Sequence, residues 1–180
     1  MKIILSGEPG IGKSTILEKI LIQCATDNKN VRGCIVKEIR NSGIRSGFKL
    51  HYLPSHKGTL LACCNRRLSL KYMSRFSVNI DAIEDELIPY IQNMSMDQES
   101  DFFIFDEIGR MQNLSPRFLP AIDSLLQVKQ PLIATIVHDN EIWSRKYKNN
   151  PNFLNFTATK QNRDSLPSLI YEKLFSPSML

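Results

Sequence analysis

The chain has 180 residues, of which 42% are hydrophobic and 23% are charged. This length suits one folded domain over residues 1–180, and the composition excludes an intrinsically disordered chain. No stretch approaches the roughly 18 apolar residues that a membrane-spanning helix needs, so we expect no membrane partner. The residues before the glycine-rich segment at the N-terminus are too few for a signal peptide, so we expect a cytoplasmic protein.

The net charge is +5, and the basic excess lies ahead of an acidic stretch from Asp81 to Glu107. We interpret the basic half as a solvated surface, with attraction of nucleotide phosphates or of nucleic acid as alternatives. No RNA-binding aromatic pattern accompanies it, so nucleic acid is disfavoured as a partner. The four cysteines show no metal-ligand spacing and are expected to be reduced structural thiols.

The first half of the chain is expected to contain a strand and a helix, followed by a middle section of antiparallel strands. Residues 2–6 are expected to form a buried strand, and residues 13–24 a helix with one apolar face. After this helix, short apolar runs separated by turn residues predict antiparallel strands. These runs cover residues 33–39, 47–53 and 59–64.

The second half alternates between helices and strands. Asp81, with Glu84 three residues later, predicts a capping box at a helix start. Ser115-Pro116 predicts the start of the next helix. The other expected elements are a buried strand at 102–105, a strand at 131–137, a helix at 141–148, a strand at 153–158 and a helix at 163–175. Apolar strands separated by helices imply an α/β fold with a mostly parallel central sheet covered on both faces.

A glycine-rich segment with the complete pattern G-x-x-x-x-G-K-[ST] follows the first strand directly. It consists of Gly7, Glu8, Pro9, Gly10, Ile11, Gly12, Lys13 and Ser14. Its glycines let successive backbone N–H groups converge on phosphate oxygens, and the following helix adds its positive dipole end. Lys13 is expected to place an ammonium on the β- and γ-phosphates, and Ser14 to offer a hydroxyl to Mg²⁺. The segment predicts a P-loop, or Walker A, nucleotide-binding protein.

Two acidic residues follow the buried strand at 102–105, where a Walker B carboxylate belongs. Asp106 is expected to bind the hydration shell of Mg²⁺. Glu107 is expected to orient or deprotonate the attacking water, with a simple surface charge as the alternative.

Two separate segments of the chain also resemble GTPase motifs. Residues 106–109 fit the D-x-x-G pattern, and residues 159–162 are similar to the T-K-x-D guanine reader, with Asn162 in place of the aspartate. An amide cannot accept from both guanine N–H groups as a carboxylate can. The substitution therefore disfavours strict guanine specificity and favours a loosely selective base site.

Four segments together resemble the THEP1-type nucleoside-triphosphatases over nearly the whole chain. They are residues 7–15, 43–48, 105–111 and 159–163. The resemblance implies a RecA-like P-loop NTPase fold, a three-layer sandwich with some antiparallel strands in its sheet. It also implies slow, Mg²⁺-dependent hydrolysis of several nucleoside triphosphates, ATP and GTP among them, with weaker action on diphosphates.

The matching segments add residues to the expected nucleotide site. We expect Thr15, Asn162 and Arg163 to bind the nucleotide together with the phosphate loop, with Arg163 as a base-site or lid residue. Arg110 is a candidate phosphate contact. Surface charge is the alternative for both arginines. The chain departs from the family at Gln112, where an acidic residue is usual, and at Arg110, where lysine is usual. We expect a monomer.

Hydrolysis is the favoured function, with Glu107 orienting water and with Lys13 and Mg²⁺ neutralising the developing charge. A P-loop small-molecule or nucleotide kinase is an alternative, because the basic middle section could hold an anionic acceptor. No arginine-rich lid supports that alternative. A nucleotide-binding regulatory module is a third possibility, although the paired Asp106 and Glu107 argue against a dead site.

Overall fold

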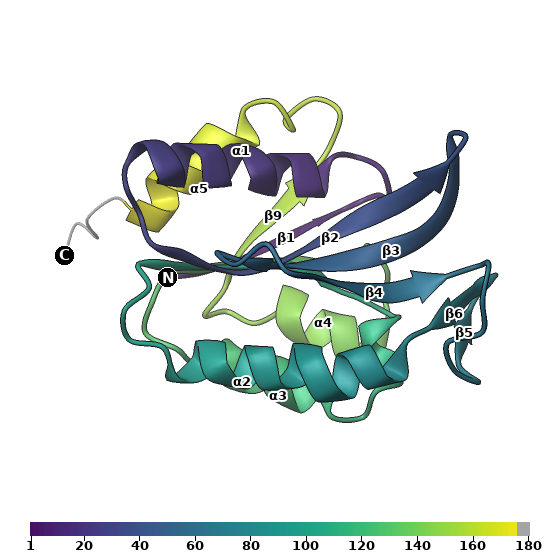
Figure 1. The fold of residues 1–180 in the computed structure, drawn as a ribbon. Helices are drawn as coiled ribbons and strands as arrows, with labels where there is room; N and C mark the ends of the chain where they lie inside the picture. The colour runs from purple at the N-terminus through teal and green to yellow at the C-terminus, as the bar shows by residue number, and fades with distance from the viewer. Residues whose placement is uncertain (176–180) are drawn as a thin grey trace. The chain divides into compact units, whose positions relative to one another are not determined.

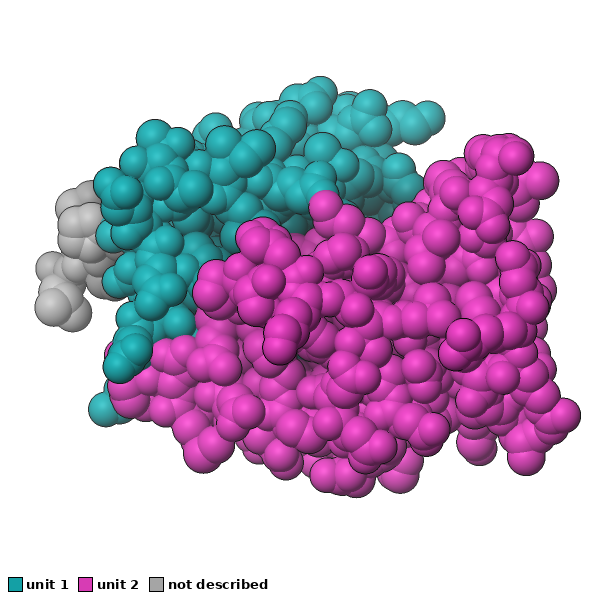
Figure 2. Space-filling view, in the orientation of Figure 1, with its two compact units in different colours: residues 1–31, 99–107, 129–180 teal, residues 32–98, 108–128 magenta. Residues whose placement is uncertain are grey.

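The computed structural model describes residues 1–175, and the chain divides into two compact units (Figure 2). Unit 1 consists of residues 1–31, 99–107 and 129–180, of which 176–180 lie outside the described residues. Unit 2 consists of residues 32–98 and 108–128. Each unit draws on separate stretches of the chain. The single domain expected over residues 1–180 stays a prediction.

Unit 1 contains a parallel sheet with the strand order β7-β8-β1-β9. Its strands are β1 (Lys2–Gly7), β7 (Phe102–Ile108), β8 (Leu132–Ile136) and β9 (Leu154–Ala158). β1 pairs in parallel with both β8 and β9. The Phe103 N–H donates to the Pro131 carbonyl, and the Glu107 N–H donates to the Thr135 hydroxyl, with the same spacing along both strands. β7 therefore runs in the same direction as β8.

Helices cover both faces of the unit 1 sheet, so this unit has three layers. α1 (Lys13–Thr26) and α5 (Leu166–Phe175) lie on one face, and α4 (Ile142–Lys148) lies on the other (Figure 1). The three strands β1, β7 and β8 are buried along almost their whole length, as parallel strands between helices must be, whereas β9 at the edge of the sheet is mostly exposed. The predicted helix start at residue 163 is wrong. The Arg163 N–H donates to the Thr159 carbonyl in a turn, and the helix begins at Leu166.

Unit 2 contains an antiparallel sheet with the strand order β5-β6-β4-β3-β2. Its strands are β2 (Val31–Asn41), β3 (Ile44–Leu53), β4 (Gly58–Cys63), β5 (Tyr72–Met73) and β6 (Phe76–Val78). The predicted antiparallel strands are confirmed. Ser42 and Gly43 join β2 to β3 with φ values of 47° and 79°, the positive pair that a tight hairpin of type I′ requires. The β5–β6 hairpin was not predicted, because its strands are too short to show alternation. The parallel and antiparallel strands together confirm the predicted fold class.

Helical segments of unit 2 pack together on one face of its sheet (Figure 1). They are a π-helical turn η1 (Ala82–Leu87), α2 (Ile88–Met96), a 3₁₀ turn η2 (Gln112–Leu114) and α3 (Phe118–Leu125). Among the described residues, none of the helices has the length and apolarity needed to cross a membrane. The sequence correctly predicts one helix before β7 in the chain and another after it.

The predicted capping box at Asp81 is wrong. The side-chain oxygen of Asn79 accepts the Ala82 N–H at 3.2 Å, so Asn79 takes the capping role. The Glu84 carboxylate instead accepts hydrogen bonds from the Ser115 hydroxyl and the Arg117 guanidinium, and these bonds lower the pKa of Glu84. Glu84 therefore joins two helical segments that are distant in sequence, an outcome that local spacing cannot reveal.

Gln112 is buried, with 1% of its surface exposed, and its amide nitrogen and oxygen have no hydrogen-bond partner among the described residues. A buried amide without partners costs about 1–3 kcal/mol. We therefore expect Gln112→Met to raise the free energy of unfolding by about 1 kcal/mol, measured by urea denaturation. Gln92→Met, at an exposed position of α2, is the control and should leave stability nearly unchanged. A Gln112→Met protein less stable than the parent would contradict this prediction.

Candidate active site

The phosphate loop joins β1 to α1 and takes its curvature from glycine backbones. Gly7 has a φ of 149° and Gly12 a φ of 109°, both in the region that L side chains rarely adopt. A Cβ atom at Gly7 would lie 2.8 Å from the Ala158 carbonyl oxygen and 3.1 Å from the Ile11 side chain. Glycine is therefore required at position 7 both by conformation and by the close approach of β9.

Lys13 lies at the first turn of α1 and folds back over the loop. Its ammonium donates to the Gly7 carbonyl at 2.6 Å and to the Glu8 carbonyl at 3.2 Å. The pKa of Lys13 lies below its ordinary value, because burial lowers it by more than the nearby charges of Glu107, Asp106 and Glu8 raise it. The ammonium is thus held within electrostatic reach of both acidic residues of β7, at the mouth of the loop.

A chain of hydrogen bonds joins the loop to β7. The Ser14 hydroxyl donates to Asp106 Oδ2 at 2.9 Å, and the Thr135 hydroxyl donates to Asp106 Oδ1 at 2.7 Å. Asp106 is 3% exposed, so its carboxylate is held from both sides in a buried position. A hydroxyl and a carboxylate oxygen in contact are the hard oxygen ligands that Mg²⁺ prefers. Ser14 and Asp106 therefore fit the predicted Mg²⁺ site.

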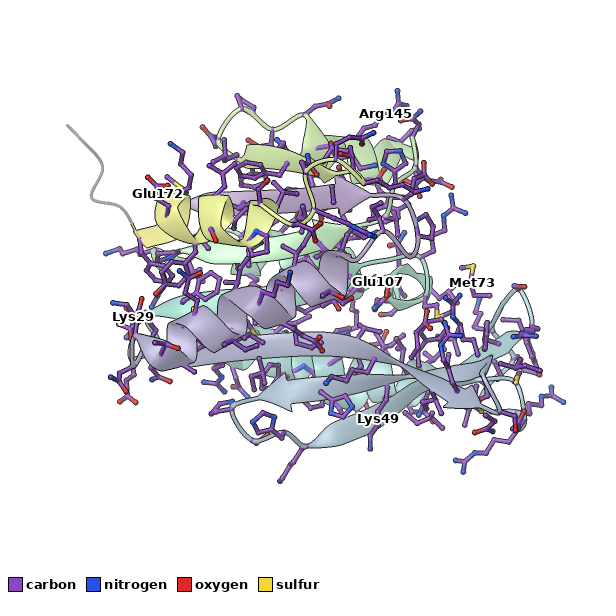
Figure 3. The ribbon with its side chains drawn as sticks, turned by 90° about the horizontal axis from the view of Figure 1, so that it is seen from above. Lys29, Lys49, Met73, Glu107, Arg145 and Glu172 are labelled. Atoms are coloured by element: carbon purple, nitrogen blue, oxygen red, sulfur yellow. The ribbon has the colours of Figure 1, made fainter. Side chains whose placement is uncertain are left out.

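Glu107 follows Asp106 at the end of β7 and has an unusual backbone. Its φ is 73°, in the left-handed region that costs a residue with a Cβ about 1–2 kcal/mol. Its side chain is half-buried, and Figure 3 labels the residue close to the N-terminal end of α1. Strained backbone of this kind gathers at functional sites, where it holds a side chain in a set direction.

Two cavities adjoin the phosphate loop. One, of about 240 Å³, is lined by Ile11, Gly12, Thr15, Ile16, Lys19, Arg163 and Asp164. The other, of about 490 Å³, is lined by Glu8, Pro9, Gly10, Ile11, His138, Thr157, Ala158, Thr159, Lys160 and Arg163. Arg163 lines both cavities and donates to the Ile11 carbonyl at 3.4 Å. The structure thus brings Thr15 and Arg163 to the same cavity beside the loop.

Asn162 is bonded to the backbone of its own loop. Its side-chain oxygen accepts the Thr159 N–H at 2.8 Å, and its amide nitrogen donates to the Thr157 carbonyl at 2.9 Å. These bonds shape the turn that carries Arg163. Contact of Asn162 with a base stays a prediction. Arg110 belongs to unit 2 and is exposed, and its contact with phosphate also stays a prediction.

Two residues at the site were missed from the sequence. Thr135 bonds to both acidic residues of β7, and the only sequence signal is a hydroxyl inside the apolar run of β8. His138 lies 3.3 Å from the Glu8 carboxylate, and both residues line the larger cavity. A histidine after a strand carries no recognisable pattern, so only the folded structure reveals this pair.

Comparisons with known proteins agree with this geometry. Residues 2–171 match a family model described as NTPase. The nucleoside-triphosphatase THEP1 of Methanocaldococcus jannaschii is 32% identical over 177 residues, which cover 98% of each chain. The crystal structure of THEP1 from Aquifex aeolicus matches with a TM-score of 0.82 at 26% identity, covering 97% of this chain and 99% of that chain.

A more distant solved structure shares the fold. The solution structure of a human cancer-related nucleoside triphosphatase matches with a TM-score of 0.77 at 23% identity, covering 98% of this chain and 99% of that chain. These likenesses confirm the predicted P-loop NTPase fold. Because the family model spans the phosphate loop, both acidic residues of β7 and the turn before α5, this chain belongs to the NTPase family that includes the THEP1 nucleoside-triphosphatases.

Proposed function

We propose that this NTPase hydrolyses the bond between the β- and γ-phosphates of nucleoside triphosphates, slowly, with Mg²⁺ and with little selectivity for the base. Water attacks the γ-phosphorus, and the products are a nucleoside diphosphate and phosphate. Such a reaction needs little covalent chemistry from the protein, because positioning and charge stabilisation supply most of the rate. The proposal therefore depends on which charged groups converge at the phosphate loop.

The convergence of Ser14, Asp106 and Glu107 at one end of β1 and β7 is the observation that carries the proposal. Ser14 and Asp106 are joined by a 2.9 Å hydrogen bond, and Glu107 contributes to the electrostatic field at Lys13. A loop that only bound nucleotide would not require a second carboxylate beside the first. The pair supports hydrolysis over simple binding.

Lys13 supplies the positive charge on the phosphates. Its two carbonyl acceptors, on Gly7 and Glu8, belong to the loop that cradles phosphate. We propose that phosphate oxygens replace these acceptors when nucleotide binds. An ammonium hydrogen-bonded to an anion interacts more strongly than one bonded to a neutral carbonyl, so the exchange favours binding.

Glu107 is proposed to orient the attacking water. Its left-handed backbone directs a half-buried carboxylate at the strand end, within electrostatic reach of the Lys13 ammonium. A carboxylate there can accept a hydrogen bond from water and align it for in-line attack. When bound, Mg²⁺ would supply positive charge across the β- and γ-phosphate oxygens, and Ser14 and Asp106 would hold it.

The proposed weak selectivity for the base rests on the hydrogen bonds that Asn162 makes within the loop after β9. Both ends of the Asn162 amide are bonded to backbone groups of that loop. The smaller cavity presents the long side chains of Lys19 and Arg163, which can adapt to different base edges. A site that reads one base needs fixed, complementary donors and acceptors.

The test of substrate range is phosphate release from ATP, GTP, CTP, UTP and the matching diphosphates, with and without Mg²⁺. We expect kcat/KM for the four triphosphates to agree within about 10-fold, which is the effect of about 1.4 kcal/mol in binding. We expect chelation of Mg²⁺ to abolish turnover and diphosphates to react more slowly. A preference for GTP well beyond 10-fold would contradict the loose base site, and full activity in chelator would contradict the Mg²⁺ dependence.

A small-molecule kinase is the second candidate, because a further cavity of about 290 Å³ adjoins the larger one. The residues that line it all have polar or charged side chains, and they are Ser6, His138, Asp139, Asn140, Lys148, Asn155 and Thr157. Two of these, His138 and Thr157, also line the cavity beside the phosphate loop. An acceptor that suppresses phosphate release while it becomes phosphorylated would favour the kinase over the hydrolase.

A further inference from the structure

Thr135 is the polar side chain of β8, a strand that is otherwise apolar and fully buried. Only 1% of its surface is exposed. Its hydroxyl accepts the backbone N–H of Glu107 at 2.7 Å and donates to Asp106 Oδ1 at 2.7 Å. One hydroxyl thus contacts both acidic residues of the neighbouring strand.

A hydroxyl suits this position because it is a donor and an acceptor at once. Its single O–H donates a hydrogen bond to Asp106, and one of its oxygen lone pairs accepts a hydrogen bond from the Glu107 N–H. Valine has nearly the same shape but neither capacity. Since threonine is branched at Cβ, its χ1 angle is strongly restricted in a packed strand, and the hydroxyl keeps a fixed direction.

The bond to Glu107 acts at the strained point of the backbone. Glu107 has a φ of 73°, which a residue with a Cβ leaves unless its surroundings hold it there. The Glu107 peptide N–H is the donor to Thr135, so the hydrogen bond restrains the same peptide group whose rotation would relax φ. The bond therefore restrains the backbone that sets the direction of the Glu107 side chain at the end of β7.

We propose that Thr135 is a positioning residue for hydrolysis. It holds the backbone of Glu107 in the left-handed conformation and orients the Asp106 carboxylate through the same hydroxyl. The inference rests on the role proposed above for Glu107 in orienting water, and it adds a dependence of that role on a residue of the adjacent strand.

The experiment compares Thr135→Val and Thr135→Ser with the parent protein. Thr135→Val removes both hydrogen bonds at nearly constant volume, and we expect kcat for ATP to fall by about 10- to 100-fold, as for a reacting group displaced by about 1 Å. The KM should change less than kcat, because both hydrogen bonds of Thr135 go to β7 rather than to the phosphate loop. Thr135→Ser keeps the hydroxyl and should recover most of the lost kcat.

Ser77→Ala is the matched control for loss of a buried hydroxyl. Ser77 is 1% exposed, and its hydroxyl accepts the N–H groups of Leu68 at 2.9 Å and Ser69 at 3.1 Å in unit 2. We expect Thr135→Val and Ser77→Ala to lose similar stability in thermal unfolding, with kcat reduced only by Thr135→Val. Equal kcat values for Thr135→Val and the parent, or no recovery in Thr135→Ser, would overturn the inference.

A second measurement needs no substitution. If the Glu107 N–H is bonded to Thr135, its hydrogen exchange in the unmodified protein should be slow, close to that of amides within β7. Exchange as fast as that of an exposed loop amide would overturn the inference even if Thr135→Val failed to fold.

The two proposals fail in different ways. Glu107→Gln tests the role of Glu107 itself, and parental turnover in that variant would remove the proposed function. If Glu107→Gln is inactive while Thr135→Val retains the parental kcat, the role of Glu107 stands and only the role of Thr135 is lost.

Discussion

Replacing Glu107 by glutamine is expected to lower kcat for ATP hydrolysis by about 100- to 10,000-fold, the usual contribution of general acid–base catalysis. Glutamine keeps the length and polarity of the side chain but cannot take a proton from water. Nucleotide binding should persist, because the phosphate loop and the bond from Ser14 to Asp106 do not involve the Glu107 side chain. Phosphate release measures turnover, and titration with a fluorescent nucleotide measures binding.

Glu172→Gln is the control for loss of one negative charge. Glu172 lies exposed on α5, where Figure 3 labels it, and its replacement should leave kcat at the parental value. A Glu107→Gln protein that hydrolyses ATP as fast as the parent would show that Glu107 does not orient or activate water. Loss of nucleotide binding together with turnover would point to damage of the loop instead.

Gly7→Ala is expected to weaken nucleotide binding by about 100-fold, which corresponds to about 2.8 kcal/mol in binding free energy. The new Cβ would meet the Ala158 carbonyl oxygen at 2.8 Å, a backbone atom of a paired strand that cannot move freely. The φ of 149° at Gly7 adds strain of its own. The loop, the Gly7 carbonyl and the Lys13 ammonium bonded to it should all shift. Titration with a fluorescent nucleotide gives the dissociation constant.

Gly43→Ala separates the collision from the conformational strain. Gly43 has a φ of 79°, and a Cβ there would meet no atom within 4 Å. Its replacement should reduce stability by about 1 kcal/mol and leave nucleotide binding intact. If Gly7→Ala bound nucleotide as tightly as Gly43→Ala, the close approach of β9 would not be what requires glycine in the loop.

The sequence by itself determined the parts of this protein that depend on local order. The complete P-loop pattern, its place after an apolar strand and before an amphipathic helix, and the acidic pair after a second apolar strand all come from neighbouring residues. Parallel strands bring their carboxyl ends to the same edge of a sheet. The sequence could therefore predict that Ser14 and Asp106 belong together before the 2.9 Å bond between them was seen.

Only the tertiary structure decided which side chains bond to groups outside their own helix or strand. Glu84 bonds to Ser115 and Arg117 rather than capping its own helix, and Asn162 bonds to its own loop. The strain at Glu107 and its restraint by Thr135 depend on the register of β7 against β8. A hydrogen bond needs its two atoms within about 3 Å, and sequence patterns do not specify distances across a sheet. Local spacing in the sequence thus predicted the main residues of the nucleotide site. Strand pairing determined which other residues hold them in position.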